Sequence, residues 1–153
     1  MTINNESAVG LEKYQINVEE FADSNLSFNF LVIEKFFDDP SKKKELLGKS
    51  VDEIYNEISI IENDSEESNE DYLLKKYVLP GTSLIEAVFR ILILNKNNPM
   101  TISEMEENLK KAWATVIYLK SYTNETISSM LNVTNEYFIT QVDLPLYFLD
   151  SLL

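Results

Sequence analysis

Apolar side chains recur at helical spacing in residues 50–61, where they fall every three or four positions on one face. Ser50 and Glu53 open this stretch with the spacing of a capping box, in which each side chain bonds the backbone N–H of the other residue. The pattern therefore predicts a helix. The residues that follow, 62–71, contain no apolar side chain and are predicted to form an acidic linker.

The most apolar stretch of the chain is SLIEAVFRILIL, residues 83–94. Ser83 and Glu86 repeat the capping-box spacing at its start, and NKNNP (95–99) marks its end. Because the apolar residues cover nearly every face, we expect this helix to be the central buried element of the fold.

A third capping box, Thr101 with Glu104, predicts a helix from about 102 to 119. Residues 124–131 then have the spacing of another short helix. The side chains of the 102–119 helix expected to face inward are Met105, Leu109, Ala112, Trp113, Val116 and Leu119.

The chain ends with two apolar stretches of strand character, EYFITQV (136–142) and PLYFLDSLL (145–153). Asp143–Pro145 lies between them as the connection, so the pattern predicts a two-stranded ribbon. A further short helix is predicted just before Pro80, in DYLLKKYVLPGT.

The first forty residues give weaker signals. Residues 1–20 are polar and are predicted to be frayed, with a short ordered piece within LEKYQINVEEF. Residues 26–37 fit either the alternation of a strand or one face of a helix. We favour the helix, with Pro40 as its stop and a helix surface for the PSKKKELL segment.

The net charge of −13 is concentrated in the first half of the chain. Residues 1–71 hold eighteen acids and six lysines, whereas 72–153 hold eight acids and seven bases. This boundary predicts an acidic, mainly helical N-terminal region (1–71) followed by a second domain (72–153). The predicted fold class is mainly α, of the α+β type.

The composition excludes several kinds of chemistry. There is no histidine or cysteine, so the usual zinc sites, catalytic triads and thiol chemistry cannot be built. No metal, cofactor or catalytic residue is therefore predicted, and a carboxylate-based enzyme is the enzymatic alternative that remains. No apolar run reaches a membrane span or a signal peptide, which predicts a cytoplasmic protein that does not bind membranes.

Residues 83–150 resemble a winged helix-turn-helix module, similar to that of the bacterial RNA polymerase delta subunit and the related HARE-type domains. The entry to its second helix is matched by Pro99, Met100, Thr101 and Glu104, and the close of its third by Met130, Leu131, Asn132, Asn135, Tyr137 and Phe138. Tyr147 matches an aromatic residue of the last strand. The resemblance implies a C-terminal winged helix with a small β-ribbon and a link to transcription.

The DNA-binding role of such modules does not transfer to these residues. From Ser121 to Leu153 there is no lysine or arginine, whereas DNA binding requires basic side chains that neutralise phosphates. Direct DNA binding is therefore not predicted.

The function predicted instead is non-enzymatic: a protein–protein interaction module or regulator whose acidic surface binds a basic partner. A DNA mimic that inhibits a nucleic-acid-binding protein is the first alternative. The apolar N-terminal cluster (Phe28, Phe30, Val32, Phe36 and Phe37) either docks on the second domain or forms a homodimer face. The residues predicted to contact a partner are Asp64, Glu66, Glu67, Glu70, Asp71, Tyr118, Tyr122 and Glu125.

Overall fold

The computed structural model describes residues 11–60, 69–113, 124–133 and 135–142. This part of the chain is mainly helical, with one three-stranded antiparallel sheet, so the predicted α+β class is confirmed. The helices are α2 (Val18–Asp23), α3 (Phe28–Phe36), α4 (Pro40–Leu46), α5 (Val51–Ile58), α6 (Asn69–Tyr77), α7 (Leu84–Leu94), α8 (Ile102–Ala112) and α9 (Asn124–Leu131). The strands are β1 (Lys13–Ile16), β2 (Met100–Thr101) and β3 (Ile139–Gln141). No described helix has the length and apolar composition needed to cross a membrane.

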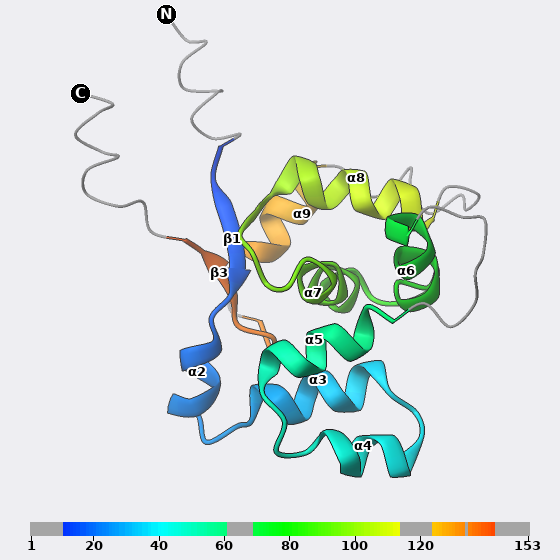
Figure 1. Ribbon diagram of the computed structural model, residues 1–153. Helices are drawn as coiled ribbons and strands as arrows, with labels where there is room; N and C mark the ends of the chain where they lie inside the picture. Colours follow the sequence, from blue (N-terminus) through cyan, green and yellow to red (C-terminus); the bar gives the residue numbers. More distant parts are fainter. Residues whose placement is uncertain (1–10, 61–68, 114–123, 134, 143–153) are drawn as a thin grey trace, which may run out of the picture.

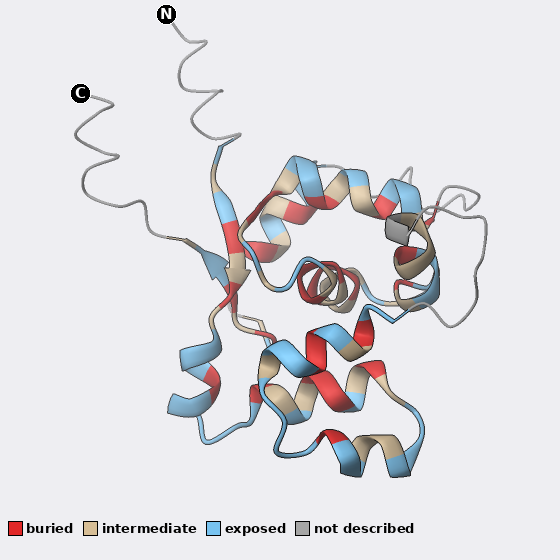
Figure 2. Ribbon diagram, in the orientation of Figure 1, coloured by how far each residue is buried: buried red, intermediate tan, exposed pale blue. Residues whose placement is uncertain are grey.

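Helix α7 occupies the middle of the fold, as its sequence predicts. Figure 1 shows it nearly end-on, with α3, α4 and α5 on one side and α8 and α9 on the other. Figure 2 shows that this helix is buried along most of its length. Its buried residues are Ala87, Val88, Phe89, Ile91, Leu92 and Ile93.

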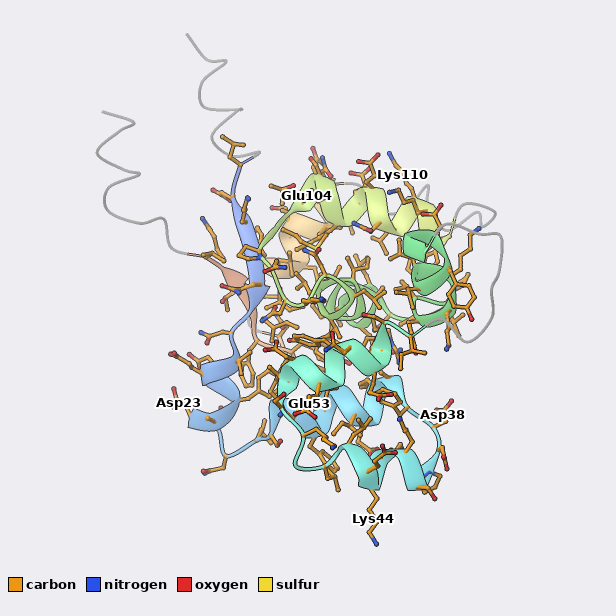
Figure 3. All side chains as sticks on the ribbon, in the orientation of Figure 1. Asp23, Asp38, Lys44, Glu53, Glu104 and Lys110 are labelled. Carbon is orange, nitrogen blue, oxygen red and sulfur yellow. The ribbon has the colours of Figure 1, made fainter. Side chains whose placement is uncertain are left out.

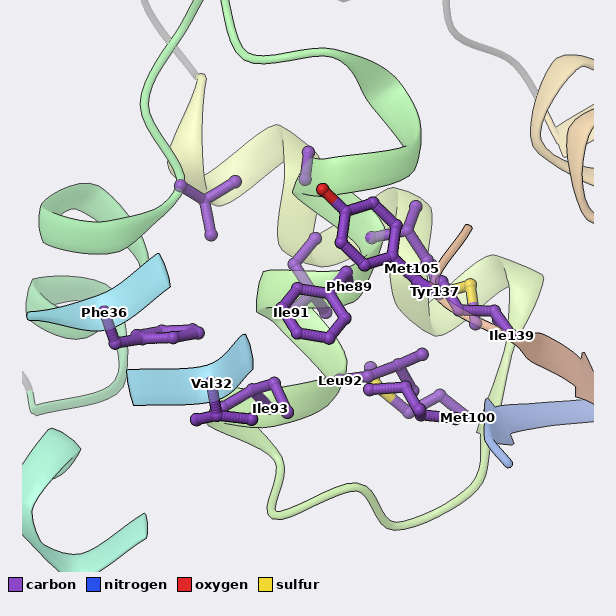
Figure 4. Packing of buried hydrophobic residues seen from close by; sticks show 14 of the residues in the cluster. Val32, Phe36, Phe89, Ile91, Leu92, Ile93, Met100, Met105, Tyr137 and Ile139 are labelled. Carbon is purple, nitrogen blue, oxygen red and sulfur yellow. The ribbon is translucent and has the colours of Figure 1, made fainter. Parts of the chain in front are cut away.

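One hydrophobic cluster joins the two halves of the chain. Val32 and Phe36 of α3 belong to the same buried cluster as Phe89 of α7 and Tyr137, which precedes β3 (Figure 4). The prediction that the N-terminal apolar residues dock on the rest of the fold is therefore confirmed for these side chains. Phe30 differs, because it is 52% exposed.

The central strand of the sheet, β1, lies within LEKYQINVEEF, the piece of residues 1–20 predicted to be ordered. β1 pairs with β2 on one side and with β3 on the other, and Ile16 lies opposite Ile139. The expected ordered piece is confirmed for residues 13–16, where Tyr14 and Ile16 are buried, but its strand conformation was not predicted. Of the predicted two-stranded ribbon, the first strand forms as β3, and its observed neighbour is β1. The second predicted strand, residues 145–153, lies outside the described part of the chain.

Residues 26–37 are helical, as we favoured, but α3 ends before Pro40. Ser27 caps the helix by accepting a hydrogen bond from the Phe30 N–H at 3.1 Å. Pro40 instead occupies the start of α4, where its missing N–H costs nothing, and Asp39 is the N-cap.

Two other boundaries differ from the prediction. Helix α6 begins at Asn69, so the last three residues of the predicted 62–71 linker are helical. Burial of Leu74 and the contact of α6 with α8 stabilise this helix. Helix α8 spans Ile102–Ala112 with buried Trp113 as its C-cap, and the Trp113 indole Nε1 donates to the Val78 carbonyl at 3.0 Å. Residues 114–119 are outside the described part.

The three predicted capping boxes have two different outcomes. Those at Ser50–Glu53 and Thr101–Glu104 are confirmed, with both reciprocal hydrogen bonds present. At the start of α7 only half of the box forms: the Glu86 N–H donates to Ser83 Oγ at 3.4 Å. The Glu86 carboxylate turns instead toward Lys35, Arg90 and Tyr137.

Candidate functional site

The described part of the chain contains an open groove of about 720 Å³, which we call the main groove. It lies where the ends of α3, α5 and α6 meet α4 and α7. Residues brought together from these helices and their connections line it: Lys35, Phe36, Phe37, Asp38, Asp39, Lys42, Glu57, Ile60, Lys76, Tyr77, Leu79, Thr82 and Arg90.

One wall of the main groove rests on a charged group that we call the Glu86 cluster, made of Glu86, Lys35, Arg90 and Tyr137. Glu86 Oε1 accepts from Lys35 Nζ at 2.8 Å and from the Tyr137 hydroxyl at 3.3 Å. Glu86 Oε2 accepts from Arg90 Nε at 3.2 Å. A single carboxylate therefore pairs with two cations and a phenol, so the cluster keeps a net positive charge.

These contacts shift the ionisation of the cluster. Burial acts to raise the pKa of Glu86, but hydrogen bonds from Lys35 and Arg90 outweigh it, so the pKa of Glu86 is lowered. The hydrogen bond to Glu86 raises the pKa of Lys35 against the opposing effect of burial. Burial, and then the nearby charge of Glu86, raise the pKa of Tyr137. At neutral pH the Glu86 carboxylate and the Lys35 ammonium group are therefore both charged. This favours a stable ion pair rather than proton transfer between the two groups.

Beside this cluster, two neighbouring aromatic rings lie between two cations in what we call the cation–aromatic stack. The Arg90 guanidinium carbon lies 5.1 Å from the centre of the Phe36 ring, and the Phe36 and Tyr77 rings are 5.0 Å apart. Lys76 Nζ follows at 5.1 Å from the centre of the Tyr77 ring. Arg90 Nη1 also donates to the Tyr77 carbonyl at 3.2 Å, which fixes the end of α6 against α7. Cations within about 6 Å of a ring centre are attracted to its face.

The groove also presents apolar side chains to solvent. Ile60 is 50% exposed and Leu79 is 54% exposed, and both line it. On the facing side, Lys42 Nζ pairs with Glu57 at 2.8 Å, so this cation is already neutralised. The groove thus combines exposed apolar side chains with fixed charges.

Among the residues predicted from sequence to contact a partner, the described side chains of Asp71 and Glu125 do not line this groove. Asp71 lies in α6 and is half-buried, and Glu125 is exposed in α9. Glu70 is also part of α6. Both α6 and α9 pack on α8. The remaining predicted residues, Asp64, Glu66, Glu67, Tyr118 and Tyr122, lie outside the described part of the chain.

Carboxylates project from several sides of the molecule. Figure 3 shows Asp23 on α2, Asp38 between α3 and α4, and Glu104 on α8 pointing away from one another. These three carboxylates therefore do not lie in one row on a single face. Within the described residues, no group of three or more acidic, histidine or cysteine side chains is arranged to hold a metal ion.

The sequence alone did not predict the main groove, because the residues that line it are spread from position 35 to position 90 and over five helices. The one available signal was the pair of unpatterned apolar residues, Ile60 and Leu79, each beside a break between helices. Comparisons of the chain with protein-family models, with curated proteins and with solved structures give no significant match.

Proposed function

We propose that this protein is a non-enzymatic protein–protein interaction module or regulator whose acidic surface binds a basic partner. The most direct support is that most lysines of residues 11–60 are already paired with glutamates. Four of the six lysines there pair with glutamates, at Lys35, Lys42, Lys43 and Lys49. The negative charges that remain are available for an outside partner.

Six exposed carboxylates in residues 11–60 have no ion-pair partner among the described side chains. They are Glu19, Glu20, Asp23, Asp38, Asp39 and Asp52. Half of them lie on the short helix α2, beside Val18, an apolar residue that is 42% exposed. An excess of one charge on an exposed surface accelerates association with a partner of the opposite charge and discriminates against others.

We further propose that the segment from α7 to β3 is a winged-helix module linked to transcription. Its order supports this: helix α7, the short strand β2, helices α8 and α9, and strand β3. In this proposal β1 takes the sheet position beside β3, and the module serves as a scaffold for partner contacts rather than for DNA.

The test is a pull-down from the native cell, followed by mass spectrometry, at low and high salt. We expect a protein with a basic surface that is retained at low salt and lost at high salt, because salt screens exposed charges. The double variant Glu19→Gln/Glu20→Gln should reduce its capture. The matched control, Glu107→Gln/Glu136→Gln, removes the same charge from exposed positions of the other half and should leave capture unchanged. Partners that are insensitive to salt and to both variants would refute the acidic-surface mechanism.

A further inference from the structure

We propose that the main groove is a second binding site, which takes a peptide segment of a partner protein carrying an acidic residue next to apolar side chains. This site is distinct from the acidic surface described above and selects the opposite charge. The inference rests on the uncompensated cations and the exposed apolar residues that the fold gathers in one groove.

The α6–α7 side of the groove carries excess positive charge. Glu86 is shared between Lys35 and Arg90, so one positive charge of that cluster has no carboxylate of its own. Lys76 adds a second, since it is exposed and makes no ion pair with any described side chain. A local excess of cations in a chain of net charge −13 favours an anionic group at this place.

The opposite side of the groove has the other sign. Asp38 and Asp39 lie in the connection between α3 and α4 and are exposed, and Asp39 also accepts a hydrogen bond from the Ser41 N–H at 3.2 Å. The groove is therefore bipolar, which fixes the direction of a bound peptide. The acidic residue of that peptide lies by Lys76 and Arg90, away from the α3–α4 connection.

Between the charges lie the contacts for apolar side chains. Ile60 and Leu79 are each at least half exposed, and the Phe36 and Tyr77 rings of the stack line the same cavity. Arg90 is held in place by Glu86, by the Tyr77 carbonyl and by the Phe36 ring, so little side-chain freedom is lost when a ligand binds. Preorganised aromatic and arginine side chains are typical of the residues that dominate binding energy at interfaces.

The test uses a displayed library of random short peptides selected on the full chain. We expect enriched peptides to combine an acidic residue with aliphatic or aromatic ones. A fluorescently labelled copy of the enriched peptide then measures affinity by fluorescence anisotropy. Lys76→Glu and Leu79→Ser should each weaken binding by about tenfold. Both positions are exposed, so both variants should fold.

The chain provides matched controls. Lys75→Glu makes the same charge reversal at the neighbouring exposed position, and Leu47→Ser removes a leucine that is 52% exposed; neither residue lines the groove. Both controls, and Glu19→Gln/Glu20→Gln, should bind the peptide like the unmodified chain, which separates this proposal from the acidic-surface function. Enrichment of basic peptides, no enrichment, equal losses in groove and control variants, or self-association abolished by Leu79→Ser would each overturn it.

Discussion

The side-chain amide of Asn97 completes the backbone hydrogen bonding of Ile16. Asn97 Nδ2 donates to the Ile16 carbonyl at 2.9 Å, and the Ile16 N–H donates to Asn97 Oδ1 at 2.8 Å. β2 pairs with β1 only as far as Met100, opposite Tyr14. The asparagine therefore extends the ladder by one step, using a side chain in place of a strand residue.

A second asparagine does the same at the other edge of the sheet. Asn135 Nδ2 donates to the Ile139 carbonyl at 3.0 Å, and the Ile139 N–H donates to Asn135 Oδ1 at 3.0 Å. Ile139 lies opposite Ile16 in the pairing of β1 with β3. The two asparagines therefore hydrogen-bond the backbone groups of this residue pair that face outward, one asparagine on each side of the pair. Occupied edge groups cannot pair with another chain, so Asn135 also protects this part of β3 from edge-to-edge association.

Replacing Asn97 should therefore destabilise the whole fold. Asn97 has a backbone φ of +55°, which glycine adopts without strain, so Asn97→Gly removes the side-chain bonds while the backbone conformation is kept. Two peptide groups of buried Ile16 lose their partners, and we expect a loss of about 2 kcal/mol in the free energy of unfolding. Urea denaturation followed by the fluorescence of the single tryptophan, which is buried, measures this loss.

The control is Asn56→Gly at an exposed position of α5, which reports only the cost of replacing asparagine by glycine in a helix, roughly 0.3–0.5 kcal/mol. A loss no larger for Asn97→Gly than for this control would show that the hydrogen bonds between the Asn97 side chain and the Ile16 backbone contribute little to the free energy of unfolding.

Trp113 should be a second sensitive position, because it ties α8 to the segment after α6. Trp113→Phe keeps an aromatic ring in the core but removes the N–H that donates to the Val78 carbonyl, and both residues are buried. The unpaired carbonyl and the smaller ring together should cost about 2–3 kcal/mol of unfolding free energy. Circular dichroism during urea denaturation provides the measurement, and a loss below about 1 kcal/mol would contradict the role given to this bond.

Local signals in the sequence predicted local structure well. The Ser50–Glu53 and Thr101–Glu104 boxes formed because all their partners lie within one helical turn. At Ser83 the box failed to close, because the Glu86 carboxylate pairs with Lys35, 51 positions away in the sequence. The Glu86 carboxylate instead pairs with Arg90, one turn further along the same helix, and with Lys35, which only the tertiary fold brings close.

The same physical reason explains the missed strand and the missed groove. Tyr14 and Ile16 form a strand only because β2 and β3 meet on either side of them, and those partners lie more than 80 positions further along the chain. The groove likewise depends on how α6 and α7 meet α3. Hydrophobic periodicity reports which face of an element is buried, but not which element covers it.

The stability of the fold at alkaline pH should depend on the ionisation of Tyr55. Burial, followed by the nearby charge of Asp52, raises the pKa of Tyr55 from 10.0 to about 12. Because the folded pKa is higher than the unfolded one, the stabilisation is fully present below pH 10 and is lost as pH rises toward 12. We expect Tyr55→Phe, which cannot ionise, to flatten the fall of unfolding free energy over this range. Unfolding curves at stepped alkaline pH test this, and an unchanged slope would contradict it.

Glu86 should govern the response to acid. Its folded pKa lies below the ordinary value of 4.5, so its stabilisation is fully present above that value. As pH falls through the folded pKa, the carboxylate takes up a proton and its pairing with Lys35 and Arg90 is lost. Unfolding free energy should therefore fall with pH in this acidic range, and Glu86→Gln should remove that part of the fall.

The same variant should also be less stable at neutral pH, since two partly buried cations lose their carboxylate. We expect a loss of about 2 kcal/mol for Glu86→Gln, against less than about 0.5 kcal/mol for Glu106→Gln. Glu106 is a matched control because it also pairs four positions along a helix, with Lys110, whose side chain is 63% exposed. Solvent screens that second pair, whereas Glu86 joins α3, α7 and the segment before β3. Equal losses in the two variants, or an acid response unchanged in Glu86→Gln, would show that the cluster does not hold these elements together.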